Sequence, residues 1–143
     1  EVLAHTPAIQ KYASEFGIPE YVPAIQAIMM QESGGRGTDP MQASECPYNT
    51  QYPNTPGAIQ DADYSIKVGI QYYADCVREA GCESPQDMDK LKLSWQGYNY
   101  GNISHGRWKN LAVTVKPMRC SFPRNRQPPM AGLVMAIQSM CLM

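Results

Sequence analysis

An apolar stretch that ends in two glycines constrains this chain more than any other feature of its sequence. Residues 27–35 are Ala-Ile-Met-Met-Gln-Glu-Ser-Gly-Gly, so a helix with an apolar face is expected to end at Glu32. A carboxyl group at the C-terminal end of a helix, among methionines, is disfavoured as an anion by desolvation and by the helix dipole. The sequence therefore predicts a raised pKa for Glu32, which a general acid needs, although a surface glutamate before a helix stop has the same local pattern.

The spacing of apolar residues predicts two helices in the first part of the chain. The first has Thr6 as its N-cap and Pro7 in its first turn, and Gly17 ends it. The second has Pro23 in its first turn and ends at Glu32. The faces expected in the core contain Ile9, Tyr12, Ala13 and Phe16 in the first helix and Ile25, Ile28 and Met29 in the second.

Two further helices are predicted beyond a long loop region. Residues 34–63 are rich in Gly, Pro, Asn, Ser and Thr, which favours loops, and we expect these loops to line a groove. A helix over 63–80 is followed by Gly81, and another starts within 84–87 and ends before Gly101. Their apolar faces are predicted to contain Ile66, Ile70, Tyr73 and Val77 in the third helix and Met88, Leu91, Trp95 and Tyr98 in the fourth.

Length and composition indicate one globular domain. The chain has 143 residues, of which 43% are hydrophobic, and this is enough for a single core. It contains no run of 18 apolar residues, so we expect no membrane span. The sequence starts at Glu1 without a methionine or an apolar leader, which suggests a processed or excised domain.

The metal-binding residue types are few and scattered. The cysteines form no C-x-x-C pair, and two isolated histidines suggest neither a metal site nor a Ser-His nucleophile, so we expect no metal and no cofactor. A disulfide from Cys46 to Cys76 or Cys82 and free buried thiols are both compatible with the sequence. The residues concerned are Cys46, Cys76, Cys82, Cys120, Cys141, His5 and His105.

Charge is distributed unevenly along the chain. All 13 acidic residues lie within residues 1–89, whereas residues 103–143 contain none and hold half of the 12 basic residues. A basic tail is typical of a nucleic-acid or membrane partner. This tail lacks interleaved aromatic residues and any recognisable binding module, so we expect no nucleic acid as a partner.

Three blocks of sequence resemble landmarks of the lysozyme-like superfamily, in the same order. Residues 25–32 resemble its catalytic "E-S" helix end, residues 39–45 (Asp-Pro-Met-Gln-Ala-Ser-Glu) its "G-L-M-Q" segment, and residues 98–102 (Tyr-Asn-Tyr-Gly-Asn) the "Y-N-x-G" motif of goose-type lysozymes and lytic transglycosylases. The likeness is greatest to the muramidase domain of two-domain cell-wall hydrolases from Gram-positive mobile elements, where an NlpC-type peptidase follows it. It extends from about Thr6 to Asn102.

This resemblance implies an all-α or α-rich α+β lysozyme-like fold, with residues 1–102 as a muramidase core and 103–143 as an atypical basic tail. It implies an extracellular or cell-wall-associated hydrolase of peptidoglycan glycan strands, natively fused to a peptidase domain. Glu32 would be the single general acid that protonates the β-1,4 bond between N-acetylmuramic acid and N-acetylglucosamine. A lytic transglycosylase and a catalytically weak glycan-binding remnant are the alternatives.

The resemblance also assigns the residues around the acid. Ser33 would hydrogen-bond near the helix end, Met41 would pack beneath the site, and Gln42 would contact the sugar. Goose-type enzymes carry an aspartate where this chain has a serine, which leaves two nearby carboxylates as candidates for activating water, Asp39 and Glu45. The full set expected to contact substrate is Ser33, Asp39, Met41, Gln42, Ser44, Glu45, Tyr98 and Asn99.

The tail departs from the family directly after Asn102. When residues 103–143 are back-translated and read two nucleotides later, permitted codons give the kind of continuation that the family has. A frameshift is our interpretation of this tail, and it explains the charge asymmetry better than a nucleic-acid-binding arm does. Such a tail was not selected to pack on this core.

Overall fold

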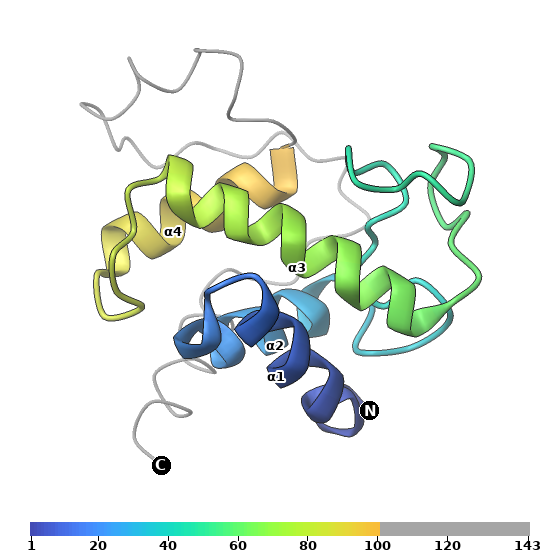
Figure 1. Cartoon of the computed structure of the whole chain (residues 1–143), viewed down its shortest axis with the longest axis horizontal. Coiled ribbons are helices and arrows are strands. Elements are labelled where there is room, and N and C mark those ends of the chain that lie inside the picture. Colours follow the sequence, from blue (N-terminus) through green and yellow to red (C-terminus); the bar gives the residue numbers. More distant parts are fainter. Residues whose placement is uncertain (101–143) are drawn as a thin grey trace, which may run out of the picture.

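The computed structural model describes residues 1–100 and consists of helices joined by loops, with no strand among these residues (Figure 1). The predicted helical architecture is therefore confirmed. Two of the helices are short 3-10 segments and four are α-helices. In chain order the elements are η1 (Val2–His5), α1 (Thr6–Glu15), η2 (Pro19–Tyr21), α2 (Val22–Glu32), α3 (Ala62–Glu79) and α4 (Met88–Tyr100).

Helix α3 is the longest element, and it packs against α1 along one part of its length and against α4 along another (Figure 1). It begins where the Asp61 carboxylate accepts hydrogen bonds from the backbone N–H groups of Asp63 and Tyr64, at 3.0 and 3.4 Å. It ends before Gly81, whose φ of 65° is a conformation that glycine adopts without strain. These two signals fix the position of α3 along the chain.

The core lies between the four α-helices, on the faces that the helical spacing predicted. In helix α2, every residue from Ala24 to Met29 is buried. The side-chain amide of Gln26, the polar residue in that stretch, donates to the hydroxyl of Thr6 at 2.9 Å. The side chains that fill the core with almost no exposure include Ile9, Ala13, Ile25, Met29, Ile66, Ile70, Tyr73 and Leu91.

Two predicted helix starts differ from the structure by one residue. Thr6 is already the first residue of α1, and His5 precedes it without a side-chain cap, because the Thr6 hydroxyl accepts from Gln26 instead. Helix α4 starts at Met88, directly after the predicted range 84–87, because the Ser84 carbonyl and hydroxyl hold a local turn there. The cap of α4 comes from the Asp87 carboxylate, which accepts from the backbone N–H of Lys90 at 3.2 Å.

The cysteines of the described region are free thiols. Cys46, Cys76 and Cys82 are all buried and form no disulfide with one another, so of the two alternatives that the sequence left open, free buried thiols are confirmed for these three. Burial raises the pKa of the Cys76 thiol to about 12, which keeps it protonated and unreactive. They act as small apolar core residues.

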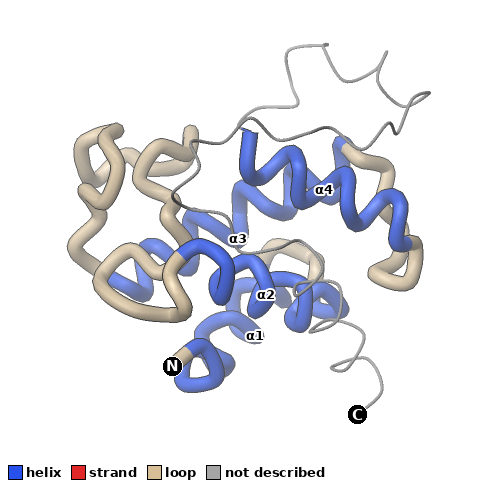
Figure 2. The backbone as a smooth tube through the Cα atoms, turned by 180° about the vertical axis from the view of Figure 1, so that it is seen from behind, coloured by secondary structure: helices blue, strands red, loops and turns tan. Residues whose placement is uncertain are grey.

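The long connection between α2 and α3 consists of turns and loops, as predicted, and it gathers beside the first part of α3 (Figure 2). No helix within residues 1–100 is both long and apolar enough to cross a membrane. The predictions for the basic tail, including its frameshift origin, concern residues 103–143 and lie outside the described residues.

Candidate active site

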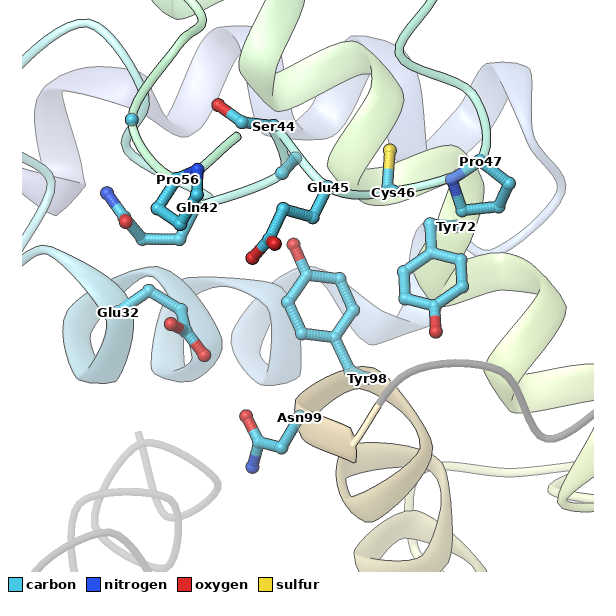
Figure 3. A pocket seen from close by; sticks show the side chains of 12 residues that line it. Glu32, Gln42, Ser44, Glu45, Cys46, Pro47, Pro56, Tyr72, Tyr98 and Asn99 are labelled. Carbon is cyan, nitrogen blue, oxygen red and sulfur yellow. The ribbon is translucent and has the colours of Figure 1, made fainter. Parts of the chain in front are cut away.

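A pocket opens between the end of α2, the loop that follows it, and the end of α4 (Figure 3). Its volume is about 640 Å³, which lies within the range of small-molecule sites. The described residues that line it are Glu32, Gln42, Ala43, Ser44, Glu45, Cys46, Pro47, Pro56, Gly57, Tyr72, Tyr98 and Asn99. The three blocks that carried the family resemblance therefore meet at one cavity.

Glu32 is the last residue of α2, and its side chain points into the pocket (Figure 3). Desolvation, and to a smaller extent the negative charge of Asp39, raise the pKa of Glu32 to about 7. The predicted rise in pKa is thus confirmed, with the charge of Asp39 as an additional cause. A carboxyl group with this pKa exists in both protonation states near neutral pH and can give up a proton to a bound molecule.

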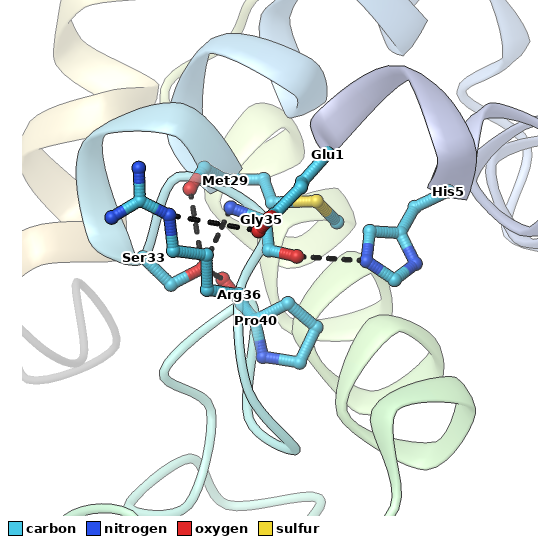
Figure 4. Close-up of polar contacts among 7 residues, drawn as sticks. All are labelled: Glu1, His5, Met29, Ser33, Gly35, Arg36 and Pro40. Carbon is cyan, nitrogen blue, oxygen red and sulfur yellow. Dashed lines mark hydrogen bonds and ion pairs between the residues drawn. The ribbon is translucent and has the colours of Figure 1, made fainter.

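Ser33 fixes the backbone directly after Glu32 (Figure 4). Its hydroxyl donates to the carbonyl of Pro40 at 2.7 Å and accepts from the backbone N–H of Gly35 at 3.0 Å. The end of α2 is thereby tied to the segment that carries the next residues of the pocket. Ser33 itself does not line the pocket, so it lies where a supporting residue would, behind the acid.

The N-terminal segment packs against the turn after α2 (Figure 4). A Cβ atom on Gly35 would come within 2.6 Å of the Val2 backbone nitrogen, so only glycine fits at this contact. The His5 ring nitrogen Nε2 lies 3.0 Å from the Gly35 carbonyl, and an exposed ion pair joins Arg36 to Glu1 at 3.5 Å. These contacts hold the turn after α2 against the N-terminal segment.

Asp39 is buried at the centre of a polar network and does not line the pocket. One oxygen, Oδ1, accepts from the backbone N–H of Ala43 at 2.9 Å and from the Ser65 hydroxyl at 2.7 Å, and Oδ2 accepts from the Ser44 hydroxyl at 2.5 Å. Ser65 in turn accepts from the backbone N–H of Met41 at 3.2 Å. The hydrogen bonds of Asp39 therefore hold the loop of residues 39–44 in its conformation.

The same network sets the positions of the loop residues that reach the pocket. Gln42 has a φ of 49°, unusual for a residue other than glycine, and its side-chain amide donates to the Asp39 carbonyl at 2.9 Å. The Ser44 hydroxyl also accepts from the backbone N–H of Ile59 at 3.1 Å and is almost fully buried at the pocket wall. Glu45, the next residue, is exposed and lines the cavity.

Tyr98 and Asn99 reach the pocket from the end of α4. The Tyr98 hydroxyl donates to the Met41 carbonyl at 2.8 Å, and burial, together with the charge of Glu32, raises the pKa of Tyr98 far above its ordinary value. Met41 is fully buried beneath the cavity and does not line it. Gly69 of α3 leaves room for the contact between Tyr98 and Met41, because a Cβ atom at position 69 would lie 2.7 Å from Cβ of Met41.

Six of the nine site residues predicted from the sequence line the pocket, whereas Ser33, Asp39 and Met41 lie behind its wall. The sequence did not single out several residues that also line it. Most of these belong to the Pro- and Gly-rich loops that were expected to form a groove, but nothing in the composition selected the individual positions. They are Ala43, Cys46, Pro47, Pro56, Gly57 and Tyr72.

Comparison with known proteins agrees with the three-block resemblance. The chain is 36% identical over 126 residues to the bifunctional muramidase/DL-endopeptidase CwlT of Bacillus subtilis (strain 168), a match that covers 87% of this chain and 34% of CwlT. It is 31% identical over 97 residues to the uncharacterized membrane protein YocA of the same strain, covering 68% of this chain and 39% of YocA. The chain thus spans little more than a third of the curated relatives that it matches.

A solved structure has the same fold over much of this chain. It is a protein of the NLP/P60 family, similar to lipoprotein, from Staphylococcus aureus subsp. aureus Mu50, and the match has a TM-score of 0.56 at 40% sequence identity. It covers 70% of this chain and 30% of that structure. The family model described as Lysozyme-like matches residues 1–104, which include every residue of the pocket described above. The chain therefore belongs to the lysozyme-like family.

Proposed function

We propose that this chain is a peptidoglycan hydrolase that cleaves the β-1,4 bond between N-acetylmuramic acid and N-acetylglucosamine, with Glu32 as its general acid. The observation that carries the proposal is the Glu32 carboxyl group, which lines an open pocket with its pKa raised to about 7. Membership of the lysozyme-like family and likeness to a relative named as a muramidase support it.

The cleavage begins with Glu32 protonated. As the bond between the muramic anomeric carbon and the bridging oxygen breaks, Glu32 gives its proton to that oxygen, which leaves as the 4-hydroxyl of N-acetylglucosamine. Positive charge then develops at the anomeric carbon, and the new Glu32 carboxylate stabilises it. The burial that raises the pKa of Glu32 therefore supports its proton donation. The same burial strengthens the attraction between the new carboxylate and the positive charge that develops beside it.

Sugar recognition in this proposal falls to the polar residues that line the pocket. Gln42 and Asn99 are exposed, and their amide groups offer donors and acceptors to the N-acetyl and hydroxyl groups of the glycan. The phenol of Tyr98 is committed to Met41, so it shapes the wall through its ring. The predicted substrate contacts of Ser33, Asp39 and Met41 become supporting roles, because these residues lie behind the wall.

A glycan substrate of this kind lies outside the cell membrane, so we place the activity outside the cell or at the cell wall. The relative CwlT is named as bifunctional, and this chain corresponds to about a third of it. We propose that the muramidase domain works natively beside a peptidase domain, and that each domain cuts a different bond of the same polymer.

The decisive experiment measures the release of reducing ends from purified peptidoglycan by the full 143-residue chain. Glu32→Gln should lower the rate by about 10²–10⁴-fold, the range for loss of a general acid, with little change in folding. Glu83→Gln, which alters an exposed glutamate away from the pocket, should keep full activity. Retained activity in Glu32→Gln would exclude it as the acid.

The products distinguish hydrolysis from lytic transglycosylation. Mass spectrometry of the released muropeptides should show reducing N-acetylmuramic acid ends if water is the acceptor. Ends that are lighter by one water, as in 1,6-anhydro sugars, would instead identify a transglycosylase, in which the muramic 6-hydroxyl closes on the anomeric carbon.

A further inference from the structure

Among the described residues that line the pocket, Glu32 and Glu45 are the two carboxylic acids. They come from different elements, since Glu32 ends α2 and Glu45 belongs to the loop beyond it, and both carboxyl groups face the same cavity (Figure 3). The cavity of about 640 Å³ leaves room for a water molecule beside a sugar. An inverting glycosidase requires this kind of arrangement, an acid and a base with a water between them.

Asp39, the other carboxylate near Glu32, is excluded from contact with such a water. Its two oxygens accept hydrogen bonds from Ala43, Ser44 and Ser65, and the residue is only 4% exposed. A carboxylate that is enclosed by protein donors and absent from the pocket wall has no path to a proton of a water in the pocket.

Glu45 has the opposite properties. Its side chain is exposed, and its carboxylate makes no hydrogen bond or ion pair with any residue in the described part of the chain. Its backbone is nevertheless held on both sides, because the flanking residues Ser44 and Cys46 are buried. The Ser44 carbonyl accepts from the Asn49 amide at 2.7 Å, and the Cys46 N–H donates to the Ala43 carbonyl at 3.1 Å. The result is a free carboxylate on a fixed backbone.

We propose that Glu45 is the general base that activates the attacking water, an inference that rests on the function proposed above. The water oxygen forms a bond to the muramic anomeric carbon while one of its protons passes to Glu45. At the same time the bond to the bridging oxygen breaks, and that oxygen takes the proton of Glu32. Water thus adds across the bond, and exchange with solvent returns both carboxyl groups to their starting states. The new hydroxyl has the inverted, α configuration.

The first test uses the full chain and soluble, peptide-free glycan strands of peptidoglycan. Glu45→Gln and Glu45→Ala should lower kcat by about 10²–10⁴-fold with little change in KM. Both should melt within a few degrees of the unaltered chain, because the replaced side chain is exposed and makes no bond to a described residue. Glu83→Gln is the matched control and should keep full activity.

Azide rescue separates a base from a structural residue. Azide needs no deprotonation, so adding it to Glu45→Ala should restore cleavage at least tenfold and yield an α-glycosyl azide, whereas Glu32→Gln should gain nothing. Proton NMR of fresh product from the unaltered chain should show the α anomer. A fully active Glu45→Gln, an inactive Glu45→Ala that azide does not rescue, or a β product would each overturn the assignment to Glu45. None of these outcomes would affect Glu32, whereas a chain that cleaves no glycan at all would contradict the proposed function itself.

Discussion

The hydroxyl group of Tyr98 donates a hydrogen bond to the carbonyl of Met41 at 2.8 Å, across 57 positions of the sequence. This contact links the end of α4 to the loop beneath the pocket. Both residues are buried, and the raised pKa of Tyr98 keeps its hydroxyl protonated and able to donate. Two of the three sequence blocks that resemble the family are therefore joined directly by one polar contact.

Replacing Tyr98 by phenylalanine tests how much this link contributes. The change removes the donor and leaves the buried Met41 carbonyl without it, so Tyr98→Phe should lower the free energy of unfolding by about 1–3 kcal/mol. Urea unfolding followed by circular dichroism measures the loss. Glycan cleavage should also fall, because the loop that carries Gln42 and Glu45 loses its attachment to α4.

Tyr52→Phe provides the matched control. The Tyr52 hydroxyl makes no hydrogen bond with a residue within 1–100, and the side chain is half-buried rather than buried. Its removal should change the free energy of unfolding by less than about 0.5 kcal/mol. If Tyr98→Phe changed the free energy of unfolding as little as Tyr52→Phe does, the hydrogen bond to Met41 would not contribute to stability.

The helices were predictable because local signals and tertiary packing agree in them. Gly17 and Gly81 both adopt positive φ values, 78° and 65°, where the sequence placed helix ends. The start of α1 was mispredicted by one residue. The Thr6 hydroxyl, expected to cap the helix, instead accepts a hydrogen bond from Gln26 of α2. Such competition between distant residues leaves no trace in the sequence around Thr6.

The site was predictable only in part, for a related reason. The helix break after Glu32 marks that residue in the sequence itself, and the raised pKa follows from the burial that such a break creates. Which of Asp39 and Glu45 faces the pocket depends on contacts with Ser65 and Ile59, which lie at least 14 residues away in the chain. Sequence analysis could therefore name both carboxylates but could not separate them.

The pKa of Glu32 predicts how stability depends on pH. Because folding raises this pKa from 4.5 to about 7, the folded state holds the proton more tightly than the unfolded state does. The contribution of Glu32 to stability is thus fully present below about pH 4.5 and is lost as pH rises through about 7. At about 1.4 kcal/mol per unit of pKa, the loss amounts to at most ~3.5 kcal/mol.

Glu32→Gln removes this titration, since glutamine stays neutral at every pH. As pH increases from 4.5 to 7.5, the unaltered chain should therefore lose stability relative to Glu32→Gln. Urea unfolding at several pH values measures the two free energies of unfolding. Glu83→Gln should follow the unaltered chain. A constant difference between Glu32→Gln and the unaltered chain over this range would contradict the raised pKa.

Asp39 should set the pH range of activity, although it does not reach the pocket. Its negative charge contributes to the raised pKa of Glu32, and a general acid works only while it is protonated, so kcat should fall as pH rises through about 7. Asp39→Asn removes that charge and should move the midpoint of the fall to lower pH. The variant should also lose about 1–3 kcal/mol of stability, because asparagine cannot accept all the hydrogen bonds that the carboxylate does.

The position of the midpoint distinguishes an electrostatic effect from simple damage to the loop. Damage alone would lower kcat by the same factor at every pH and leave the midpoint in place, whereas loss of the Asp39 charge shifts it. Asp89→Asn, which neutralises an exposed aspartate in the first turn of α4, should change neither the height nor the midpoint of the profile. An unshifted midpoint in Asp39→Asn would mean that Glu32 owes its raised pKa to burial alone, and that Asp39 serves the site only through the shape of the loop.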